Sequence, residues 1–306
     1  MKNRTRKNLA IICACALMGC ILVPSYQAEA AESHMDQVTE MDSTYEGFMA
    51  NDDTLTFDEI KSLPGAIVAE EYDALIDLKV TPVSELFHMG MSPADVERIK
   101  TKSVKDLVLE NVATYPDEFL ESKGLSADTV QAIKTGNYDV VSESEARRVG
   151  AQLALGIASI SRVGNQLNYT VYWHWDNSRP LNLIEDVILT TISNDYCIQG
   201  GSTGKAYYAP INSMEEDMEE RIYPSSEVGT NGIRYDIAMQ YPAPVGNRWT
   251  KSGKAFVPTQ YGYAGVVDIF AEYFHKWTDV TVEVIDGHLK FPVNSGDTTR
   301  THTSVS

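Results

Sequence analysis

The chain has 306 residues, and its 43 Asp and Glu outnumber its 25 Lys and Arg, which gives a formal net charge of −18 at pH 7. Long-range electrostatic attraction does not draw so acidic a chain to nucleic acid or to anionic lipid. We therefore expect no nucleic-acid partner. The longest apolar run, Leu9–Val23, is shorter than the roughly 20 residues of a membrane-crossing helix. We expect no transmembrane segment.

Residues 1–31 have the layout of a secretory signal peptide. A basic start (Lys2, Arg4, Arg6 and Lys7) precedes the apolar run, and small residues follow at Ala28-Glu29-Ala30-Ala31. This pattern predicts export, with cleavage after Ala30 or Ala31. Removal of the four basic residues and Glu29 lowers the net charge by 3, to −21. The alternative is a lipid anchor on Cys20, because Leu17-Met18-Gly19-Cys20 resembles a lipobox. Since the apolar run continues past Cys20, we favour soluble secretion.

The remaining cysteine and the histidines predict no metal or redox chemistry. Cleavage removes Cys13, Cys15 and Cys20, so Cys197 is the single cysteine of the mature chain. We interpret Cys197 as a structural thiol, because its surroundings match no cysteine-protease signature. The histidines form no His-x-His or His-x-x-x-His pair, which disfavours a local zinc site. We expect no metal site and no cofactor.

The hydrophobic pattern divides the mature chain into a helical and a β-rich part. From 54 to 140 the apolar spacing is helical, and from 151 to 293 it alternates with a period of two. The region 141–150 is predicted to link the two, with Ser142 and Glu145 placed to cap a short helix. The acidic segment 32–53 and the Ser/Thr-rich tail 294–306 are predicted to be flexible.

The helical part contains an internal repeat with an offset of 34 residues. Pro82 to Thr101 aligns with Pro116 to Thr135, and Pro, Leu, Gly, Ser, Ile, Lys and Thr recur in register. Each unit is predicted to form two helices, with the glycine (Gly90 or Gly124) ending the first and the serine (Ser92 or Ser126) capping the second. The period equals that of the tetratricopeptide repeat, whose Trp, Gly and Tyr markers are missing.

The β-rich part predicts an antiparallel β-sandwich of immunoglobulin-like size. The fold class is therefore α+β, with a helical repeat module followed by the sandwich. Leu167, Tyr169, Val171, Trp173 and Trp175 fall on one face of a strand. Further strands are predicted at 153–160, 187–191, 233–241, 266–274 and 280–285.

Two sets of side chains are candidates for function. Tyr172 and His174 lie on the face opposite the tryptophans and are candidates for a binding platform. Asp236, Asp268 and Glu272 occupy positions within strands, where charge is unusual, and with His174 they are the candidate catalytic residues of a secreted hydrolase acting on glycan or peptide. Motifs of serine hydrolases and phosphate-binding loops are missing from the sequence.

The helical repeats (Gly90–Lys100 and Gly124–Lys134) followed by the Tyr172–Trp175 strand resemble an uncharacterised family of secreted proteins from Gram-positive bacteria. The resemblance implies secretion and the helical-plus-β layout, and it implies no activity. We predict a non-catalytic binding protein of the cell exterior, with a cell-envelope polymer or an extracellular protein as partner. The alternative is the hydrolase.

We expect the exported protein to begin at Ala31 or Glu32, because signal peptidase cleaves after small residues. N-terminal sequencing of the protein from culture medium measures this directly. An intact amino terminus, or a chain lipidated on Cys20 in the membrane fraction, contradicts the prediction.

Overall fold

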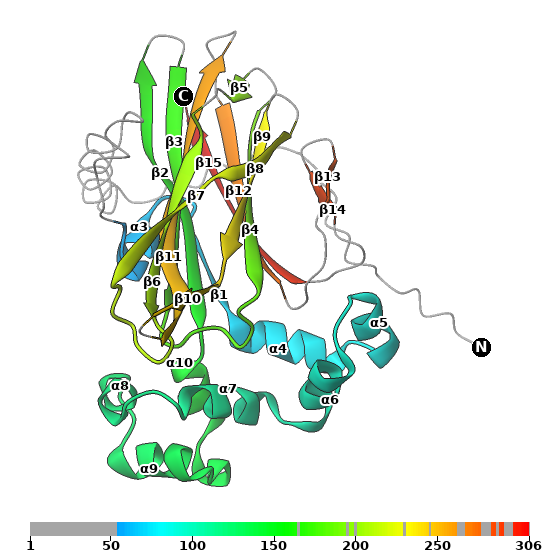
Figure 1. Cartoon of the computed structure of the whole chain (residues 1–306), viewed down its shortest axis with the longest axis vertical. Helices are drawn as coiled ribbons and strands as arrows, with labels where there is room; N and C mark the ends of the chain where they lie inside the picture. The colour runs from blue at the N-terminus through cyan, green and yellow to red at the C-terminus, as the bar shows by residue number, and fades with distance from the viewer. Residues whose placement is uncertain are drawn as a thin grey trace, which may run out of the picture.

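The computed structural model describes residues 54–163, 166–193, 196–198, 201–228, 231–244, 246–261, 267–276, 283–285, 288–290 and 296–305. The predicted signal peptide, Cys20 and the segment 32–53 lie outside these residues. The described chain is α+β, with antiparallel sheets above a group of short helices (Figure 1).

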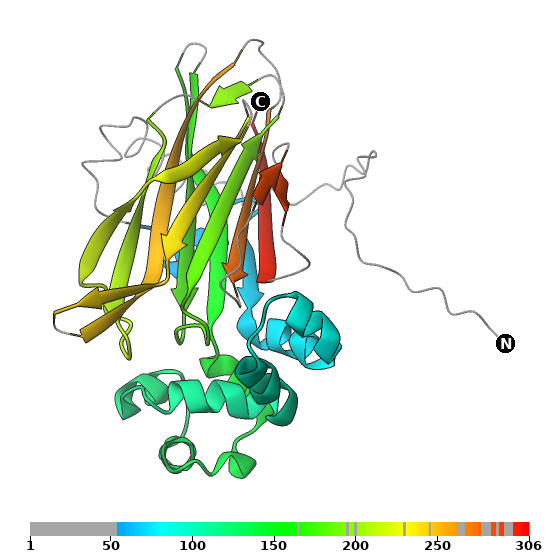
Figure 2. The same ribbon diagram turned by 45° about the vertical axis from the view of Figure 1, so that its right-hand side comes forward.

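Seven α-helices and one 3-10 helix of the described chain lie together at one end of the sheets (Figures 1 and 2). They are α4 (Glu71–Val80), α5 (Val83–His88), α6 (Pro93–Thr101), α7 (Val104–Val112), α8 (Asp117–Ser122), α9 (Ala127–Thr135), η1 (Tyr138–Val140) and α10 (Glu143–Val149). One further helix, α3 (Phe57–Ser62), lies apart from them, beside the strands.

Sheet A has eight strands, in the order β1-β2-β3-β11-β6-β7, with β5 and β10 also paired to β11. Its strands are β1 (Ile67–Glu70), β2 (Gln152–Val163), β3 (Gln166–Asp176), β5 (Tyr196–Ile198), β6 (Thr203–Pro210), β7 (Met218–Ile222), β10 (Gln240–Ala243) and β11 (Gly246–Tyr261).

Sheet B has five strands, in the order β15-β12-β4-β9-β8. They are β4 (Glu185–Ile192), β8 (Pro224–Val228), β9 (Gly232–Ala238), β12 (Val267–Lys276) and β15 (Gly296–Val305). A separate pair consists of β13 (Glu283–Ile285) and β14 (His288–Lys290).

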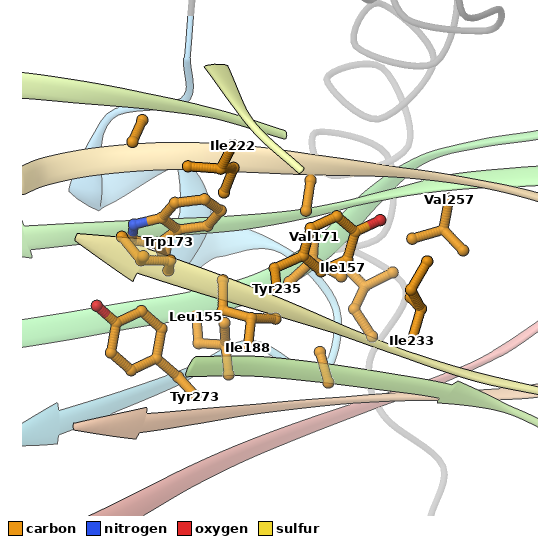
Figure 3. Close-up of a cluster of buried hydrophobic side chains, with 14 of the residues drawn as sticks. Leu155, Ile157, Val171, Trp173, Ile188, Ile222, Ile233, Tyr235, Val257 and Tyr273 are labelled. Atoms are coloured by element: carbon orange, nitrogen blue, oxygen red, sulfur yellow. The ribbon is translucent and has the colours of Figure 1, made fainter. Parts of the chain in front are cut away.

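The main hydrophobic core lies between the two sheets. Alternate residues of strands in both sheets enter it, including Trp173 and Trp175 of β3 and Tyr273 of β12. The rings of Trp173 and Tyr273 have centroids 6.5 Å apart and point into the same space (Figure 3). The predicted core face of β3 is therefore confirmed.

Helix α3 covers part of the outer face of sheet A. Phe57, Ile60 and Leu63 form a second buried cluster with Ala154, Ala158 and Tyr172. Gly156 of β2 permits this close approach, because a Cβ there would lie 2.9 Å from Leu63 Cδ1. The Thr56–Glu59 capping box begins the helix.

The helical part is inserted between two paired strands. Strand β1 pairs antiparallel with β2, and Glu70 lies directly opposite Gln152. The chain therefore leaves sheet A at Glu70, forms all the helices from α4 to α10, and returns beside the strand that it left. The predicted helical module at 54–140 is wrong in its first residues, because α3 and β1 pack with the sheets.

The helical repeat is confirmed in its local details. Helices α5 and α6 form one unit and α8 and α9 the next, with Gly90 and Gly124 at φ of 83° and 78°. Left-handed geometry of this kind favours glycine. The hydroxyl oxygens of Ser92 and Ser126 accept hydrogen bonds from backbone N–H groups of the following helices.

The lysine of each repeat donates to main-chain carbonyls just before its own unit. Lys100 donates to the carbonyls of Leu78 (3.0 Å) and Lys79 (2.7 Å) at the end of α4, and Lys134 donates to the carbonyl of Tyr115 after α7. Lys79 reciprocates by donating to the carbonyls of Ile99 and Lys100. Helix ends leave carbonyls without intrahelical partners, which an ammonium group satisfies.

Two predicted boundary segments are regular structure. The region 141–150 contains α10, which begins with the predicted Ser142–Glu145 capping box, and it buries Ala146 and Val149 in the helical core. The predicted flexible tail 294–306 is wrong, because residues 296–305 form β15 and pair with β12. The β-branched threonines of this segment favour a strand, and hydrophobic alternation alone misses it.

We expect Lys100→Met to lower the free energy of unfolding by about 1–3 kcal/mol, because partly buried carbonyls at the end of α4 lose their donor. Chemical denaturation measures the change. Lys61→Met, in the exposed last turn of α3, is the control, with an expected effect within about 0.5 kcal/mol. Equal effects of the two substitutions contradict the capping role.

Candidate functional site

The predicted platform of Tyr172 and His174 is buried, which corrects the expectation of an exposed binding face. Tyr172 belongs to the cluster beneath α3, and its hydroxyl lies 2.9 Å from Ser159 Oγ. His174 Nδ1 lies 3.1 Å from the carbonyl oxygen of Leu55, which precedes α3. These side chains help to hold α3 against sheet A, and a sugar or peptide does not reach them.

The candidate hydrolase residues do not gather in one cleft. Their neighbours on β9 and β12 point into the core, so Asp236, Asp268 and Glu272 lie on the outer face of sheet B. His174, two residues after Tyr172 on β3 and in contact with the Leu55 carbonyl, lies on the outer face of sheet A, on the opposite side of the sandwich. The histidine is therefore separated from all three carboxylates by the hydrophobic core.

The carboxylates are also poorly placed with respect to one another. Strands β9 and β12 flank β4, where Asp236 lies opposite Val187 and Glu272 opposite Leu189. Two strand spacings and a two-residue offset put the two backbones about 12 Å apart, whereas the catalytic carboxyl groups of glycosidases are about 5–9.5 Å apart. Asp236 is moreover paired with Arg234, 2.6 Å from its guanidinium.

A buried polar network at the lower end of the sandwich centres on Asp186 of β4. Its carboxylate accepts from the Tyr273 hydroxyl (2.8 Å) and from the Lys276 backbone N–H (3.1 Å), and His275 Nδ1 lies 3.1 Å from both oxygens. Burial and the Asp186 charge raise the pKa of Tyr273. The adjoining cavity of about 30 Å³ has room for a water molecule, not for a substrate.

The helical part has an open hollow of about 490 Å³ between α4 and the start of α7, bordered by η1 and α10. Its lining combines an aromatic ring, aliphatic side chains, hydroxyl, ammonium and carboxylate groups: Tyr72, Ile76, Lys79, Ser103, Val104, Lys105, Asp106, Asp139 and Glu143. A concave surface with an apolar wall and a few polar groups is typical of a recognition site.

The basic and the acidic groups of the hollow differ in the contacts that they already make within the chain. Lys79 donates to carbonyls at the end of α6, and Lys105 donates to the carbonyls of Tyr138 (2.8 Å) and Val141 (3.0 Å). In the described part of the chain, Asp106, Asp139 and Glu143 take part in no ion pair. Glu143 and Asp106 contribute to a raised pKa of Tyr72, whose largest cause is burial.

Tyr72 already holds a cation on its ring. The Arg147 guanidinium lies 4.6 Å from the ring centroid and donates to Asp73 (2.7 Å) and to Glu70. These hydrogen bonds raise the pKa of Arg147 above its usual range. The chain thus shows, beside the hollow, how a guanidinium is bound by this tyrosine together with carboxylates.

An apolar ridge borders the hollow. Ile76 and Val80 are four residues apart on α4, and Val83 and Phe87 are four residues apart on α5, so each pair lies on one helix face. All four side chains are exposed, Val80 to 76% and Phe87 to 47%. Ile76 also lines the hollow, so the ridge and the hollow share this residue.

Sequence reasoning missed this surface. The spacing of Ile76, Val80, Val83 and Phe87 is the same signal as that of a buried helix face, and only the structure separates the two. Asp139 stands at the end of the predicted helical module and Glu143 in the predicted linker, where acidic residues are ordinary. The sequence does carry one indication of this surface. Helix α4 has more apolar positions than its buried face needs, because Leu75 and Leu78 already occupy that face.

Within the described residues, no helix is long and apolar enough to cross a membrane. No group of three or more His, Cys, Asp or Glu side chains in these same residues is arranged to hold a metal ion. Cys197 lies on β5, whose backbone pairs with β11.

The sequence matches no protein-family model and no curated protein. Similarity to solved structures extends over about half of the chain. The collagen-binding subdomain of the Enterococcus faecalis surface protein ACE is 8% identical, with 47% of this chain and 88% of that chain covered and a TM-score of 0.23. The collagen-binding domain of a Staphylococcus aureus adhesin is 7% identical, with 48% and 95% covered and a TM-score of 0.27.

The collagen-binding domain of the Erysipelothrix rhusiopathiae surface protein RspB is 14% identical, with 50% of this chain and 44% of that chain covered and a TM-score of 0.27. TM-scores this low carry no argument about the activity or the ligand of the present chain. The functional conclusion therefore rests on its own residues.

We expect the stability of the chain to fall as pH drops through the ordinary histidine pKa of about 6.5, in part because of His174. Burial, followed by the charge of Lys251, lowers the pKa of His174 in the folded state. The unfolded chain then binds a proton before the folded chain does, which favours unfolding.

The measurement compares the free energy of unfolding of the wild type and of His174→Gln between pH 7.5 and pH 5. Glutamine retains a donor for the Leu55 carbonyl and does not titrate. The wild type should lose more stability than the variant over this range. Parallel pH profiles would show that His174 does not titrate as described.

Proposed function

We propose that the chain is a non-catalytic binding protein of the cell exterior that contacts an extracellular protein through the helical part. The observation that carries this proposal is the apolar ridge of Ile76, Val80, Val83 and Phe87, exposed beside a hollow. In this proposal the sandwich is the scaffold, and the inserted helices are the recognition module.

The ridge supports a protein partner because of its composition and its place. Scattered apolar side chains are ordinary on a surface, whereas two pairs at helical spacing on α4 and α5, which are joined by Thr81 and Pro82 alone, concentrate four of them in one short stretch of chain. Aromatic and aliphatic side chains surrounded by charged groups are typical of the centre of a protein interface. Asp73 and Asp77 of α4 and Glu85 of α5 supply charged groups around the ridge.

A protein partner is favoured over a cell-envelope polymer. Sugar rings are recognised by stacking on exposed aromatic faces, and the aromatic strand residue predicted for this purpose, Tyr172, is buried beneath α3. Phe87 is exposed on α5, four residues from the exposed Val83, which suits apolar side chains of another protein. The location outside the cell is supported by the signal-peptide pattern and by the resemblance to secreted proteins.

The hydrolase alternative gains no support from the geometry. Asp236, Asp268 and Glu272 lie across the core from His174, and Asp236 is held by Arg234. An enzyme of this class needs such groups gathered in one cleft. We therefore assign no catalytic role to these residues.

We expect the Val83→Ser/Phe87→Ser double variant to lose its partner, because the two exposed apolar side chains that α5 contributes to the ridge are removed. Purified wild type and variant are immobilised and incubated with culture-medium and cell-wall fractions of the source organism. Retained proteins are quantified by mass spectrometry. The partner should be depleted at least about tenfold on the variant, as expected for central apolar contacts.

Tyr223→Ser is the matched control, because Tyr223 is an exposed aromatic residue (64%) outside the ridge. It should retain the partner as the wild type does. The thermal unfolding midpoints of all three proteins are compared to exclude loss of folding. Retention of the same proteins by the wild type and the double variant, or specific retention by neither, overturns the proposal.

A further inference from the structure

We propose that the hollow beside the ridge binds a basic side chain, an arginine guanidinium or a lysine ammonium, of the extracellular protein partner. This inference rests on the proposed function and specifies the chemistry of the partner: a basic residue flanked by apolar residues. The apolar residues contact the ridge, and the basic residue enters the hollow.

The hollow has the size and the walls that such a side chain needs. Its volume of about 490 Å³ holds the side chain of an arginine together with water. Ile76 and Val104 line it, so the aliphatic stem of a basic residue meets apolar walls. Ile76 belongs to both surfaces, which places the basic residue next to the residue that contacts Val80, one turn further along α4.

The electrostatics of the hollow favour a cation. Three carboxylates line it (Asp106, Asp139 and Glu143), and none of them is paired with a basic residue in the described part of the chain. The two ammonium groups that also line it, those of Lys79 and Lys105, are directed to main-chain carbonyls at helix ends. A ligand cation therefore gains carboxylate contacts without displacing an existing ion pair.

Asp106 and Glu143 also stand in the first turns of α7 and α10, where a negative charge stabilises the helix. This role is compatible with binding, because a carboxylate has two oxygens and several lone pairs. Asp139, in the 3-10 helix η1, has no such place at the start of an α-helix and still faces the same hollow.

The chain itself provides the precedent for this recognition. Arg147 lies over the ring of Tyr72 and is bound by Asp73 and Glu70. Tyr72 is also part of the wall of the hollow, where Asp106 and Glu143 act on its hydroxyl. Tyr72 is buried and its ring is already covered by Arg147, so the carboxylates of the hollow are the groups left to bind a second guanidinium.

The test uses two small probes with the folded mature chain. Nα-acetyl-arginine methylamide carries the guanidinium, and Nα-acetyl-citrulline methylamide is its neutral isostere. Backbone amide signals are followed by NMR as each probe is added at millimolar concentrations. We expect the arginine probe to shift the amides of Tyr72, Asp106 and Glu143, and the citrulline probe to bind at least about tenfold more weakly.

The variant that tests the carboxylates is Asp106→Asn/Asp139→Asn/Glu143→Gln. The matched control is Asp58→Asn/Glu118→Gln/Asp128→Asn, which changes the net charge equally at exposed first-turn positions outside the hollow. The first variant should lose the arginine response at least about tenfold, and the control should keep it. All proteins are checked for the wild-type circular dichroism spectrum.

The outcomes separate this inference from the proposed function. An equal response to both probes, the same loss in both triple variants, or no arginine shift at the hollow overturns the inference. If partner retention nevertheless depends on Val83 and Phe87, the ridge is a binding surface without a cation site. If the arginine response is present and retention does not depend on the ridge, the proposed protein-binding function fails while the cation site stands.

Discussion

The loop between β3 and β4 is bound by side chains of the helical part, and this contact fixes the position of the helices beneath the sandwich. Asn111 of α7 donates to the Arg179 carbonyl (2.7 Å), the Tyr115 hydroxyl accepts from the Arg179 N–H (2.8 Å), and the carboxylate of Glu71 accepts from the Leu181 N–H (2.6 Å). These buried groups would each lose a partner if the helices moved away, which costs roughly 1–3 kcal/mol per unsatisfied group. Arg179 extends the contact to the turn that follows β6 by donating to the Ile211 carbonyl (2.8 Å).

This attachment decides which helix faces are available to a partner. Helix α4 directs Leu75 and Leu78 into the helical core, and Glu71 at its start is bonded to the sandwich, so Ile76 and Val80 are left on the exposed side. Lys79 and Lys100 link the ends of α4 and α6, because each donates to carbonyls at the end of the other's helix. The start of α7, which follows α6 in the chain, therefore lies across the hollow from α4. The ridge and the hollow are therefore held by the same hydrogen bonds that hold the helices, which is the rigid support that a recognition surface needs.

Local patterns predicted most of the elements, and long-range contacts decided what the sequence could not show. The glycine and serine of each repeat were interpreted correctly because a left-handed turn and an N-cap depend on neighbouring residues alone. The face of β3 that carries Tyr172 was misread, because alternation shows that two faces differ and does not show that α3 covers one of them. Strand β15 was missed because its stability comes from pairing with β12. The predicted hydrolase site was wrong because it also depended on long-range contacts. Asp236 and His174 are both within strands, and only the sheet order places them on opposite sides of the core.

The insertion of the helices between Glu70 and Gln152 has a consequence for how the chain folds. Strand β1 and strand β2 form a hairpin whose connection is the whole helical part. Closing a long flexible loop costs conformational entropy and slows pairing, although the cost grows only with the logarithm of its length. The contacts within the helical part are local by comparison, so its helices can form before the two strands meet. Once they have formed, Glu70 and Gln152 emerge side by side, and the first strand of the sheet reaches its neighbour through a preformed connection rather than through a random search.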